Sequence, residues 1–399
     1  MKRSLLAFII TICIILSITA CSGGNGTQEG AGSNEDVIRI AHIGPLTGDG
    51  APWGTAEINA INMFAEEINA KGGVIGKKLK IYSYDNRYDN VETTNAARKA
   101  INNDKVCAII GTNGSSNSIA LASVCEELKV PHIATTATNP QVTLKEDGSV
   151  RPYSFKVIIS DPQQGSAIAN FAINNLKAKT AAVLYEIGSD YSTGIKNAFV
   201  NSFTADGGDV VTIEAFKTGD VDFRAQLSKI KEKNPDIIFF PITYKEIALA
   251  TSQARNLGIE STFLGGDSWL NTDLFTLAPE AVNGSYFVNS LNPNDPKLDD
   301  FKAKYKQKYN QEAGGEGGNC YFAWDAMLVL TTAIEKAQST DPSEIRDALE
   351  NVKDVDGLTG KTTINPVTHN PTKPVSIFKI ELNPNNFKLI TTVNPGDVK

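Results

Sequence analysis

Short runs of apolar, largely β-branched residues alternate along this chain with longer stretches in which apolar residues recur every three or four positions. The short runs predict buried strands, and the longer stretches predict amphipathic helices. In the clearest unit, Val106–Ile110 predicts a strand, residues 115–128 a helix and Val130–Ala134 the next strand. Strand, helix and strand in this order form a right-handed crossover in a parallel sheet, so the pattern predicts an α/β fold.

The same rhythm begins again in the middle of the chain and predicts a second α/β lobe. The strands expected there are Ala181–Glu186, Val210–Phe216, Asp236–Pro241 and Thr262–Leu264. Each half then offers three strand ends whose loops lie at the carboxyl edge of a sheet, where small-molecule sites form. Three helices and a strand pair follow at Lys297–Tyr309, Cys320–Ala337, Pro342–Leu349, Val375–Ile380 and Phe387–Val393. This tail fits a chain that recrosses between two similar lobes before it ends.

The first residues have the order of a lipoprotein signal. A basic start precedes the apolar run Leu5–Leu16, and Ile18–Cys21 has the form of a lipobox. The apolar run is short for a helix that spans a membrane. We therefore expect residues 1–20 to be removed as a signal peptide, Cys21 to carry a lipid, and the polar residues 21–36 to act as a flexible tether.

Charge and cysteine content narrow the class of protein. The formal net charge is −7, and loss of two basic residues with the signal peptide makes the body more acidic, which argues against nucleic-acid binding. The body is long enough for two hydrophobic cores. Only Cys107, Cys125 and Cys320 remain in it, so at most one disulfide can form. We expect buried free thiols, with a Cys107–Cys125 bridge as the alternative.

Two hydroxyl-rich loops follow neighbouring predicted strands. Gly114–Ser118 comes after Ile110, and Thr135–Pro140 comes after Ala134. Because both loops lie at the carboxyl edge of one parallel sheet, we expect them to be close together. Hydroxyl and backbone N–H groups beside a helix N-terminus suit an anionic group such as a carboxylate. A single serine in such a loop could simply cap its helix, but two such loops on adjacent strands favour a ligand.

The chain carries no strong enzyme or metal-site motif. The glycines of residues 48–54 resemble a dinucleotide-binding loop only loosely, because their spacing differs and Pro52 and Trp53 crowd the place of the pyrophosphate. The three histidines stand outside paired motifs, and no CxxC, Walker or EF-hand pattern occurs. A triad assembled from distant residues stays open, and we expect no metal and no cofactor.

Several short motifs share the order and spacing of a known family. They are Ile43-Gly-Pro-Leu-Thr-Gly, Ile68-Asn-Ala-Lys-Gly-Gly, Ile110-Gly with its serine loop, Thr135–Pro140, Asp190-Tyr-Ser-Thr-Gly, Asp222-Phe-Arg-Ala-Gln-Leu and Leu264-Gly-Gly-Asp. Together they resemble the type I periplasmic solute-binding proteins, in the leucine/isoleucine/valine-binding branch of transport receptors. The resemblance implies two doubly wound α/β lobes joined by three crossovers, with closure around a ligand by hinge bending. Residues 37–157 and 290–367 would form lobe 1, and residues 158–289 and 368–399 lobe 2.

The resemblance also implies which residues bind the ligand. In lobe 1, Ser115, Thr136 and Thr138 would hold the α-carboxylate and ammonium of an amino acid, and Trp53 would cover it. In lobe 2, Tyr191 and Tyr244 would close over the ligand, and Asp267 would meet the ammonium. Two departures affect the expectation: the best-known members have cysteines near Tyr88 and Gly114, and they carry Glu where this chain has Asp267. We expect Trp269 to pack in the core rather than to contact a ligand.

The function implied is that of a receptor that delivers a small amino acid, aliphatic or branched, to an ABC permease. The protein would be a monomer held by the lipid on Cys21 at the outer face of the cytoplasmic membrane, without nucleic-acid partners. Alternatives are a related receptor for an amide, urea or aromatic acid and, from another class, an exported nucleotide-dependent enzyme on the same α/β sheets.

The lipid anchor has a direct test in Cys21→Ala. We expect this variant to leave the membrane fraction, because the tether lacks an apolar face that could hold the protein there. Fractionation followed by immunoblotting measures the distribution. A variant that stays wholly in the membrane fraction through a high-salt wash would contradict the lipoprotein interpretation.

Overall fold

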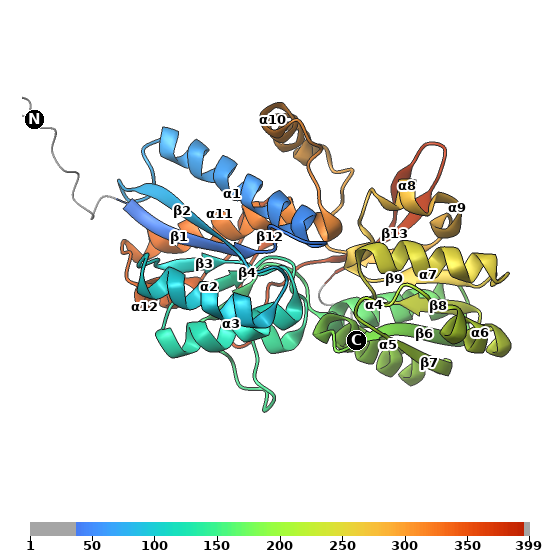
Figure 1. Cartoon of the computed structure of the whole chain (residues 1–399). Helices are drawn as coiled ribbons and strands as arrows, with labels where there is room; N and C mark the ends of the chain where they lie inside the picture. The colour runs from blue at the N-terminus through green and yellow to red at the C-terminus, as the bar shows by residue number, and fades with distance from the viewer. Residues whose placement is uncertain (1–36, 395–399) are drawn as a thin grey trace, which may run out of the picture. The chain divides into compact units, whose positions relative to one another are not determined.

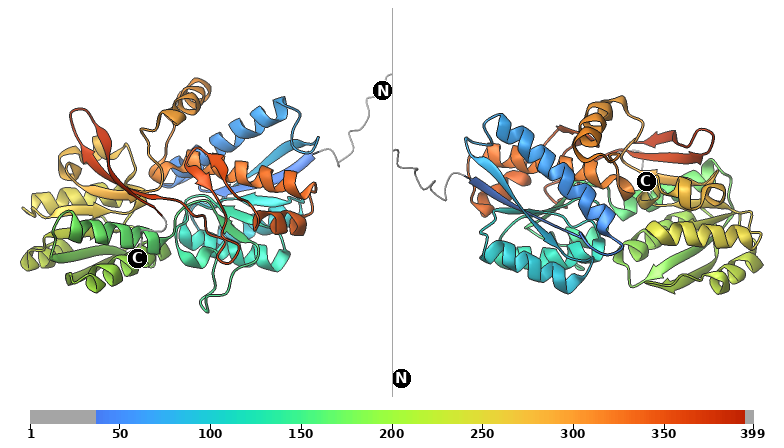
Figure 2. Two further views of the ribbon diagram at one scale, coloured as in Figure 1. Left: turned by 180° about the vertical axis from the view of Figure 1, so that it is seen from behind. Right: turned by 45° about the horizontal axis from the view of Figure 1, so that its top comes forward.

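The structure is a computed structural model that describes residues 37–394. Two large sheets organise this part of the chain. One sheet has five strands and the other has seven, and a small two-stranded sheet accompanies them. Helices flank both large sheets (Figures 1 and 2). The predicted fold class, two doubly wound α/β lobes, is confirmed, whereas the residue limits given to the lobes stay a prediction. The signal peptide, Cys21 and the tether lie outside the described residues.

The first sheet is wholly parallel, with the strand order β2-β1-β3-β4-β5. Its strands are β1 (Val37–Gly44), β2 (Lys78–Asp85), β3 (Ala108–Ile110), β4 (His132–Ala134) and β5 (Ser154–Lys156). The helices of this lobe are α1 (Ala51–Ala70), α2 (Asn90–Asn102), α3 (Ser115–Leu128), α11 (Asn319–Ala337) and α12 (Pro342–Leu349). Helices α1 and α11 pack together on one face, and α2 and α3 on the other (Figure 1).

Strand β1 shows why the sheet needs two helical layers. Ile38 and Ile40 belong to the larger core, which includes residues of α1 and α11, whereas Ala41 and Ile43 belong to a second core with residues of α2 and α3. All four side chains are fully buried. A strand that is apolar on both sides is stable only between two covered faces, as in other parallel sheets.

The second sheet has the order β14-β13-β10-β9-β8-β6-β7 and is parallel except at the pairs β10–β13 and β13–β14. Its strands are β6 (Thr180–Ile187), β7 (Asp209–Lys217), β8 (Ile237–Phe240), β9 (Thr262–Gly265), β10 (Tyr286–Asn289), β13 (Val375–Glu381) and β14 (Asn386–Val393). Its helices are α4 (Asp161–Asn174), α5 (Asp190–Ala205), α6 (Arg224–Lys233), α7 (Tyr244–Asn256), α8 (Leu274–Leu277) and α9 (Pro279–Val282). Trp269 is fully buried here, as expected, and its Nε1 donates to the carbonyl of Phe240 (3.0 Å).

The chain passes between the two large sheets three times: after β5, after β10 and before β13. The remaining elements are α10 (Asp299–Tyr309), β11 (Val355–Gly357), β12 (Gly360–Thr362) and the short 3₁₀ helices η1 (Pro140–Val142), η2 (Asp267–Trp269), η3 (Pro296–Leu298) and η4 (Glu316–Gly318). The three crossings agree with the predicted recrossing of the tail, and they bring η2 and η4 next to each other.

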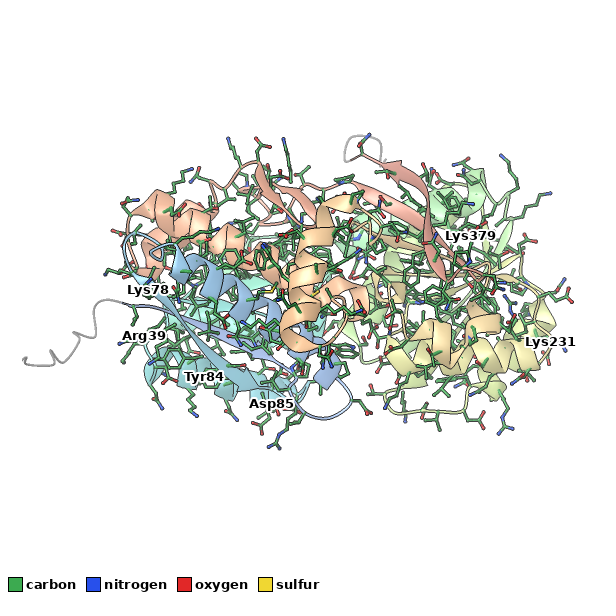
Figure 3. The ribbon with its side chains drawn as sticks, turned by 90° about the horizontal axis from the view of Figure 1, so that it is seen from above. Arg39, Lys78, Tyr84, Asp85, Lys231 and Lys379 are labelled. Atoms are coloured by element: carbon green, nitrogen blue, oxygen red, sulfur yellow. The ribbon has the colours of Figure 1, made fainter. Side chains whose placement is uncertain are left out.

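A carboxylate at the end of β2 fastens the loop that leads into α1. Figure 3 shows Lys78 and Asp85 at opposite ends of this strand. Asp85 accepts hydrogen bonds from the backbone N–H groups of Leu46 (2.8 Å) and Arg87 (2.9 Å), and a further one from the Thr47 hydroxyl. The first loop of lobe 1 is therefore held against the neighbouring strand end.

Three observations bear on earlier expectations. Cys107, Cys125 and Cys320 are free and buried, which confirms the expected thiols and excludes the Cys107–Cys125 bridge. Among the described residues, no helix has the length and apolar character needed to cross a membrane. Within the same part of the chain, no group of three His, Cys, Asp or Glu side chains is arranged to hold a metal ion.

A buried ion pair holds the third crossing. Lys373, just before β13, is fully buried, and its Nζ lies 3.8 Å from Oδ2 of the buried Asp325 in α11. Asp325 also accepts from the backbone N–H groups of Leu358 (2.6 Å) and Thr359 (2.9 Å). A Cβ at Gly357 would lie 2.4 Å from the Asp325 carboxylate, so only glycine allows this approach. The carboxylate thereby ties the crossing segment to lobe 1.

Asp325→Ala should destabilise the fold by about 3–5 kcal/mol, because it leaves the buried Lys373 without its counter-charge and two backbone N–H groups without an acceptor. Urea unfolding followed by circular dichroism measures the change. Asp347→Ala, which removes an exposed carboxylate of the neighbouring α12, is the control and should change stability little. Equal midpoints for the two variants would contradict this role of Asp325.

Candidate functional site

A cavity lies where the carboxyl-edge loops of the two large sheets meet. It contains about 420 Å³ of empty space, its open mouth included. The described residues that line it are Trp53, Tyr88, Asn113, Gly114, Ser115, Thr136, Tyr191, Thr243, Asp267, Ser268, Glu316, Gly317 and Asn319. They come from α1, α3, α5, α11 and the loops after β2, β3, β4, β8 and β9 together with η4. Both lobes thus contribute to one small-molecule-sized site.

Five of the seven ligand-binding residues predicted from the sequence line this cavity. They are Trp53, Ser115, Thr136, Tyr191 and Asp267. Thr138 is fully buried and is not part of the lining. Tyr244 is the first residue of α7, and its neighbour Thr243 lines the cavity; the Tyr244 side chain lies outside the description.

Ser115 and the start of α3 offer hydrogen-bond donors at one end of the cavity. Gly114 is the N-cap of α3 and has no side chain, so Ser115 does not cap the helix, contrary to the simpler interpretation of this serine. Ser115 Oγ accepts a hydrogen bond from the backbone N–H of Asn139 (3.2 Å), so its own proton remains available for donation. The first intrahelical bond runs from Ser118 N–H to Gly114 O (2.9 Å), and the preceding N–H groups point out of the helix end.

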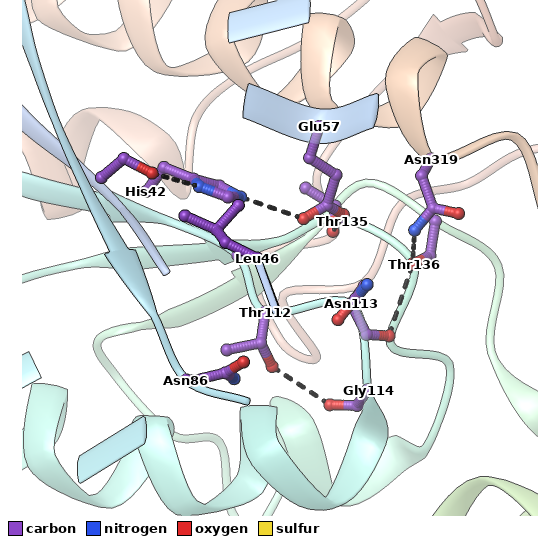
Figure 4. A network of polar contacts seen from close by, with 12 residues as sticks. His42, Leu46, Glu57, Asn86, Thr112, Asn113, Gly114, Thr135, Thr136 and Asn319 are labelled. Atoms are coloured by element: carbon purple, nitrogen blue, oxygen red, sulfur yellow. Dashed lines mark hydrogen bonds and ion pairs between the residues drawn. The ribbon is translucent and has the colours of Figure 1, made fainter. Parts of the chain in front are cut away.

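Thr136 connects the two hydroxyl-rich loops to α11. Its Oγ1 donates to the carbonyl of Asn113 (3.4 Å) and accepts from Asn319 Nδ2 (3.3 Å) (Figure 4). The three residues come from the loops after β3 and β4 and from the first turn of α11. This chain of hydrogen bonds holds one side of the cavity in a fixed arrangement.

A polar network built on the fully buried His42, Glu57 and Thr135 supports this side of the cavity. Glu57 of α1 accepts from the Thr135 hydroxyl, and its second carboxylate oxygen lies 3.2 Å from His42 Nε2 (Figure 4). His42 Nδ1 in turn lies 3.2 Å from the Ser83 hydroxyl. Since Thr135 precedes Thr136, the network fixes the loop that presents Thr136 to the cavity.

Aromatic side chains enclose the ligand space. The rings of Trp53 and Tyr88 meet edge to face, with centroids 5.1 Å apart. Tyr191 is buried, with its hydroxyl 3.1 Å from Ser268 Oγ, and Ser268 donates to the carbonyl of Ile242 (2.8 Å). Tyr191 packs in the cavity wall beside Asp267, and its hydroxyl is close to both Ser268 and the Asp267 carboxyl group.

Asp267 supplies a buried negative charge. Burial raises the pKa of its carboxyl to about 6, although the nearby Tyr191 hydroxyl and Gln164 amide oppose the shift. Its backbone is fixed, because its N–H donates to Gln164 Oε1 (3.0 Å) and its carbonyl accepts from Asn289 Nδ2 (3.1 Å). Its Oδ1 has no hydrogen-bond partner among the described residues. A buried acceptor of this kind suits a ligand that brings a cation.

Behind Asp267, the first crossing carries a second buried pair. Lys156 ends β5 and Asp161 begins α4, and both are fully buried. Lys156 Nζ donates to the carbonyls of Thr138 (2.8 Å) and Asn139 (3.3 Å), which explains why Thr138 lies behind the cavity wall. Burial lowers the pKa of Lys156 and raises that of Asp161, and their mutual attraction opposes both shifts. One ammonium thus faces two carboxylates, Asp161 and Asp267.

Sequence reasoning missed eight of the described lining residues. These are Tyr88, Asn113, Gly114 as part of the lining, Thr243, Ser268, Glu316 with Gly317, and Asn319. Asn113 and Ser268 adjoin motifs that were recognised. The run Gly314-Gly315-Glu316-Gly317-Gly318 offered the clearest signal, because an acid amid glycines marks a backbone with unusual dihedral angles. Gly315, Gly317 and Gly318 indeed have positive φ angles.

The arrangement offers a donor end, an isolated acid and aromatic walls. Ser115 with the α3 N-terminus can hold a carboxylate, and Asp267 can hold an ammonium. Among the described lining residues there is no histidine, cysteine or lysine.

Comparison with known proteins gives a consistent result. A family model described as periplasmic binding protein matches residues 37–386. The Leu/Ile/Val-binding protein BraC3 of Rhizobium johnstonii is 29% identical over 345 residues, which cover 86% of this chain and 92% of that protein.

Solved structures agree. A leucine-binding protein LivK of Thermotoga maritima is 35% identical, with a TM-score of 0.82 over 90% of this chain and 99% of that one. The substrate-binding protein LivJ of a branched-chain amino acid transporter from Streptococcus pneumoniae, solved with isoleucine, is 29% identical, with a TM-score of 0.79 and the same coverage of both chains.

Proposed function

Because this chain belongs to the periplasmic binding protein family, in the branch of substrate-binding proteins of branched-chain amino acid ABC transporters, we propose that it is a receptor that binds a small amino acid in its cleft. Members of this branch are solute receptors and not enzymes, and this chain is of the same kind. The cleft residues would bind the ligand, and the receptor would deliver it to an ABC permease.

The observation that carries the proposal is the pairing of an anion-binding end with an isolated acid in one cavity. A free amino acid brings a carboxylate and an ammonium into the cleft, and each needs a partner, because an unpaired buried charge is costly. Ser115 and the N–H groups of α3 would bind the carboxylate, and Asp267 with the Thr136 oxygen would bind the ammonium. The sequence prediction assigned the same roles to these residues.

The Asp267 carboxylate and the donor groups at the α3 end also argue against the alternative ligands, an aromatic acid, an amide or urea. An aromatic acid would bring a negative charge and no ammonium, so Asp267 would stay uncompensated, and no basic side chain occurs among the described lining residues. An amide or urea would satisfy Asp267 only in part and would leave the α3 end without an anion. An exported nucleotide-dependent enzyme is excluded by the family.

Location and partners complete the proposal. The lipid on Cys21 would hold a monomeric receptor at the outer face of the cytoplasmic membrane, and the two lobes would close around the ligand by bending at the three crossings. The relatives include a Leu/Ile/Val-binding protein and a leucine-binding protein, which supports the predicted aliphatic or branched ligand.

Asp267→Asn should weaken amino-acid binding by about 2–5 kcal/mol, the usual cost of removing one partner from a buried ion pair. This corresponds to tens- to thousands-fold in Kd. Titration calorimetry with an amino-acid panel measures it. Asp273→Asn, which changes an exposed acid a few residues away, is the control and should bind as the parent does. If Asp267→Asn bound its amino acid with unchanged affinity and an intact fold, the zwitterion proposal would fail.

The raised pKa of Asp267 predicts pH-dependent binding. The ammonium of a bound amino acid favours the charged carboxylate, so affinity should be full above the unliganded pKa of about 6 and should fall as the pH drops through it. The expected loss is about tenfold per pH unit below that point. Calorimetry at pH 7.5, 6 and 5 provides the profile. In Asp267→Asn the slope should vanish; a slope that persisted there would assign the titration to Lys156 or Asp161 instead.

A further inference from the structure

The apolar surface of the cavity comes mainly from aromatic rings. Its accessible lining is more apolar than polar, and the large apolar side chains among the described lining residues are those of Trp53, Tyr88 and Tyr191. Tyr191 is buried beside Asp267, at the end that would hold the ammonium of an amino acid. Trp53 and Tyr88, which meet edge to face with centroids 5.1 Å apart, are therefore the rings left to receive the side chain of a ligand.

The ring of Tyr88 stands directly on Gly114, the N-cap of α3. A Cβ added at Gly114 would lie 2.7 Å from Cε2 and 2.8 Å from Cζ of the Tyr88 ring, which is closer than such atoms pack. The backbone of Gly114 has φ −85° and ψ 139°, which most residues adopt readily, so its conformation does not require glycine. The contact with the ring does. Because Ser115 follows Gly114, the ring lies next to the end of the cavity that would hold the ligand carboxylate.

The loop that carries Tyr88 holds its ring in place. Arg87 and Tyr88 have φ angles of +50° and +59°, a left-handed conformation that residues with a side chain adopt at a cost. The fully buried Asn86 supports this conformation, because its Oδ1 accepts from the N–H of Tyr88 (3.0 Å) and its Nδ2 donates to Thr93 Oγ1 (2.9 Å). The N–H of Asn86 donates to the carbonyl of Gly44 (3.1 Å). The buried amide of Asn86 therefore fixes the direction in which the Tyr88 side chain leaves the loop.

Tyr88 also separates the cavity from solvent. It lines the cavity, and yet 43% of it is exposed, so the residue has one side toward the ligand space and another toward water. Loss of the ring would widen the mouth of the cavity at this place. The ring thus decides how far the side chain of a ligand extends beyond Trp53.

We propose that Tyr88 is a specificity-determining residue. Its ring, seated on Gly114 and packed against Trp53, closes the side-chain end of the cavity, so that aliphatic side chains such as those of valine and leucine fit and an aromatic side chain does not. The inference rests on the proposed function, since it assumes that Ser115 and Asp267 hold the α-carboxylate and the ammonium. It deepens that function by naming the residue that sets which side chains are accepted.

The physical reason is the burial of apolar surface in a space of fixed size. An aliphatic side chain that lies against the two rings leaves water and gains close contacts with them. Each methyl or methylene group that fits such a pocket changes affinity by roughly 10- to 200-fold. A larger aromatic side chain would have to displace the Tyr88 ring, which is costly because the hydrogen bonds of Asn86 hold its loop.

Calorimetry on the full-length chain in detergent tests the inference with L-alanine, L-valine, L-leucine and L-phenylalanine. In the unaltered protein, affinity should rise from alanine to leucine and fall at phenylalanine. Tyr88→Ala should weaken leucine about tenfold or more and alanine much less, and phenylalanine should gain relative to leucine. Val91→Ala, which shortens an exposed apolar side chain three positions further on, is the control and should leave all four affinities unchanged.

Two further variants separate the effect of the ring from that of its loop. Tyr88→Phe keeps the ring and should bind the four ligands as the parent does. Gly114→Ala places a Cβ against the ring and should weaken leucine in the parent. In the Tyr88→Ala background the same change should cost clearly less, because the ring that it meets is gone. Circular dichroism checks that each variant is folded.

The outcomes separate the inference from the proposed function. If the parent bound leucine but Tyr88→Ala weakened leucine and alanine by the same factor, or neither of them, the inference would be overturned while the amino-acid receptor stood. The same would follow if Tyr88→Phe lost as much affinity as Tyr88→Ala, or if Gly114→Ala cost the same in both backgrounds. If the parent bound no α-amino acid, the proposed function and the inference would both be overturned.

Discussion

A carboxylate that is buried in a cleft needs a positive charge nearby, and this constraint organises the ligand site. Asp267 follows a strand of the second sheet, and its backbone is fixed by Gln164 and Asn289, yet one of its oxygens has no partner among the described residues. Lys156 is a buried cation that interacts electrostatically with both Asp161 and Asp267. The cluster thus has one positive charge for two negative ones. An ammonium brought by a ligand would balance it, which links the chemistry of the ligand to the first crossing between the lobes.

The rest of the site depends on how rigidly the loops of the first sheet are held. Asp85 fastens the loop before α1, and the buried contacts of Glu57 with His42 and Thr135 hold the loop after β4. These groups do not line the cavity, so they act on the ligand only through the residues they position. A fixed donor end opposite a fixed acid suits a ligand of one length between its carboxylate and its ammonium, which is the feature that all α-amino acids share.

The sequence predicts the scaffold better than it predicts the whole site. Apolar periodicity located the strands, and the rule that ligands bind at the carboxyl edge of parallel strands led to the two hydroxyl-rich loops. The family resemblance then named Ser115, Thr136 and Asp267, which all line the cavity. Local sequence patterns could not show that the Thr138 carbonyl accepts a hydrogen bond from Lys156, because that contact depends on the crossing after β5. Nor could local patterns show that Glu316 lies near Asp267. These residues are far apart in the chain, and only the packing of the second crossing places η4 beside η2.

The most direct test of the central claim is to identify the compound that the native protein carries. The full-length receptor would be purified without added ligand and mildly denatured, and the released small molecule would be identified by mass spectrometry. The account predicts an α-amino acid, with a free carboxylate and a free ammonium. An acid without an amino group, such as an aromatic acid, would contradict it, because Asp267 would then be buried without a counter-charge.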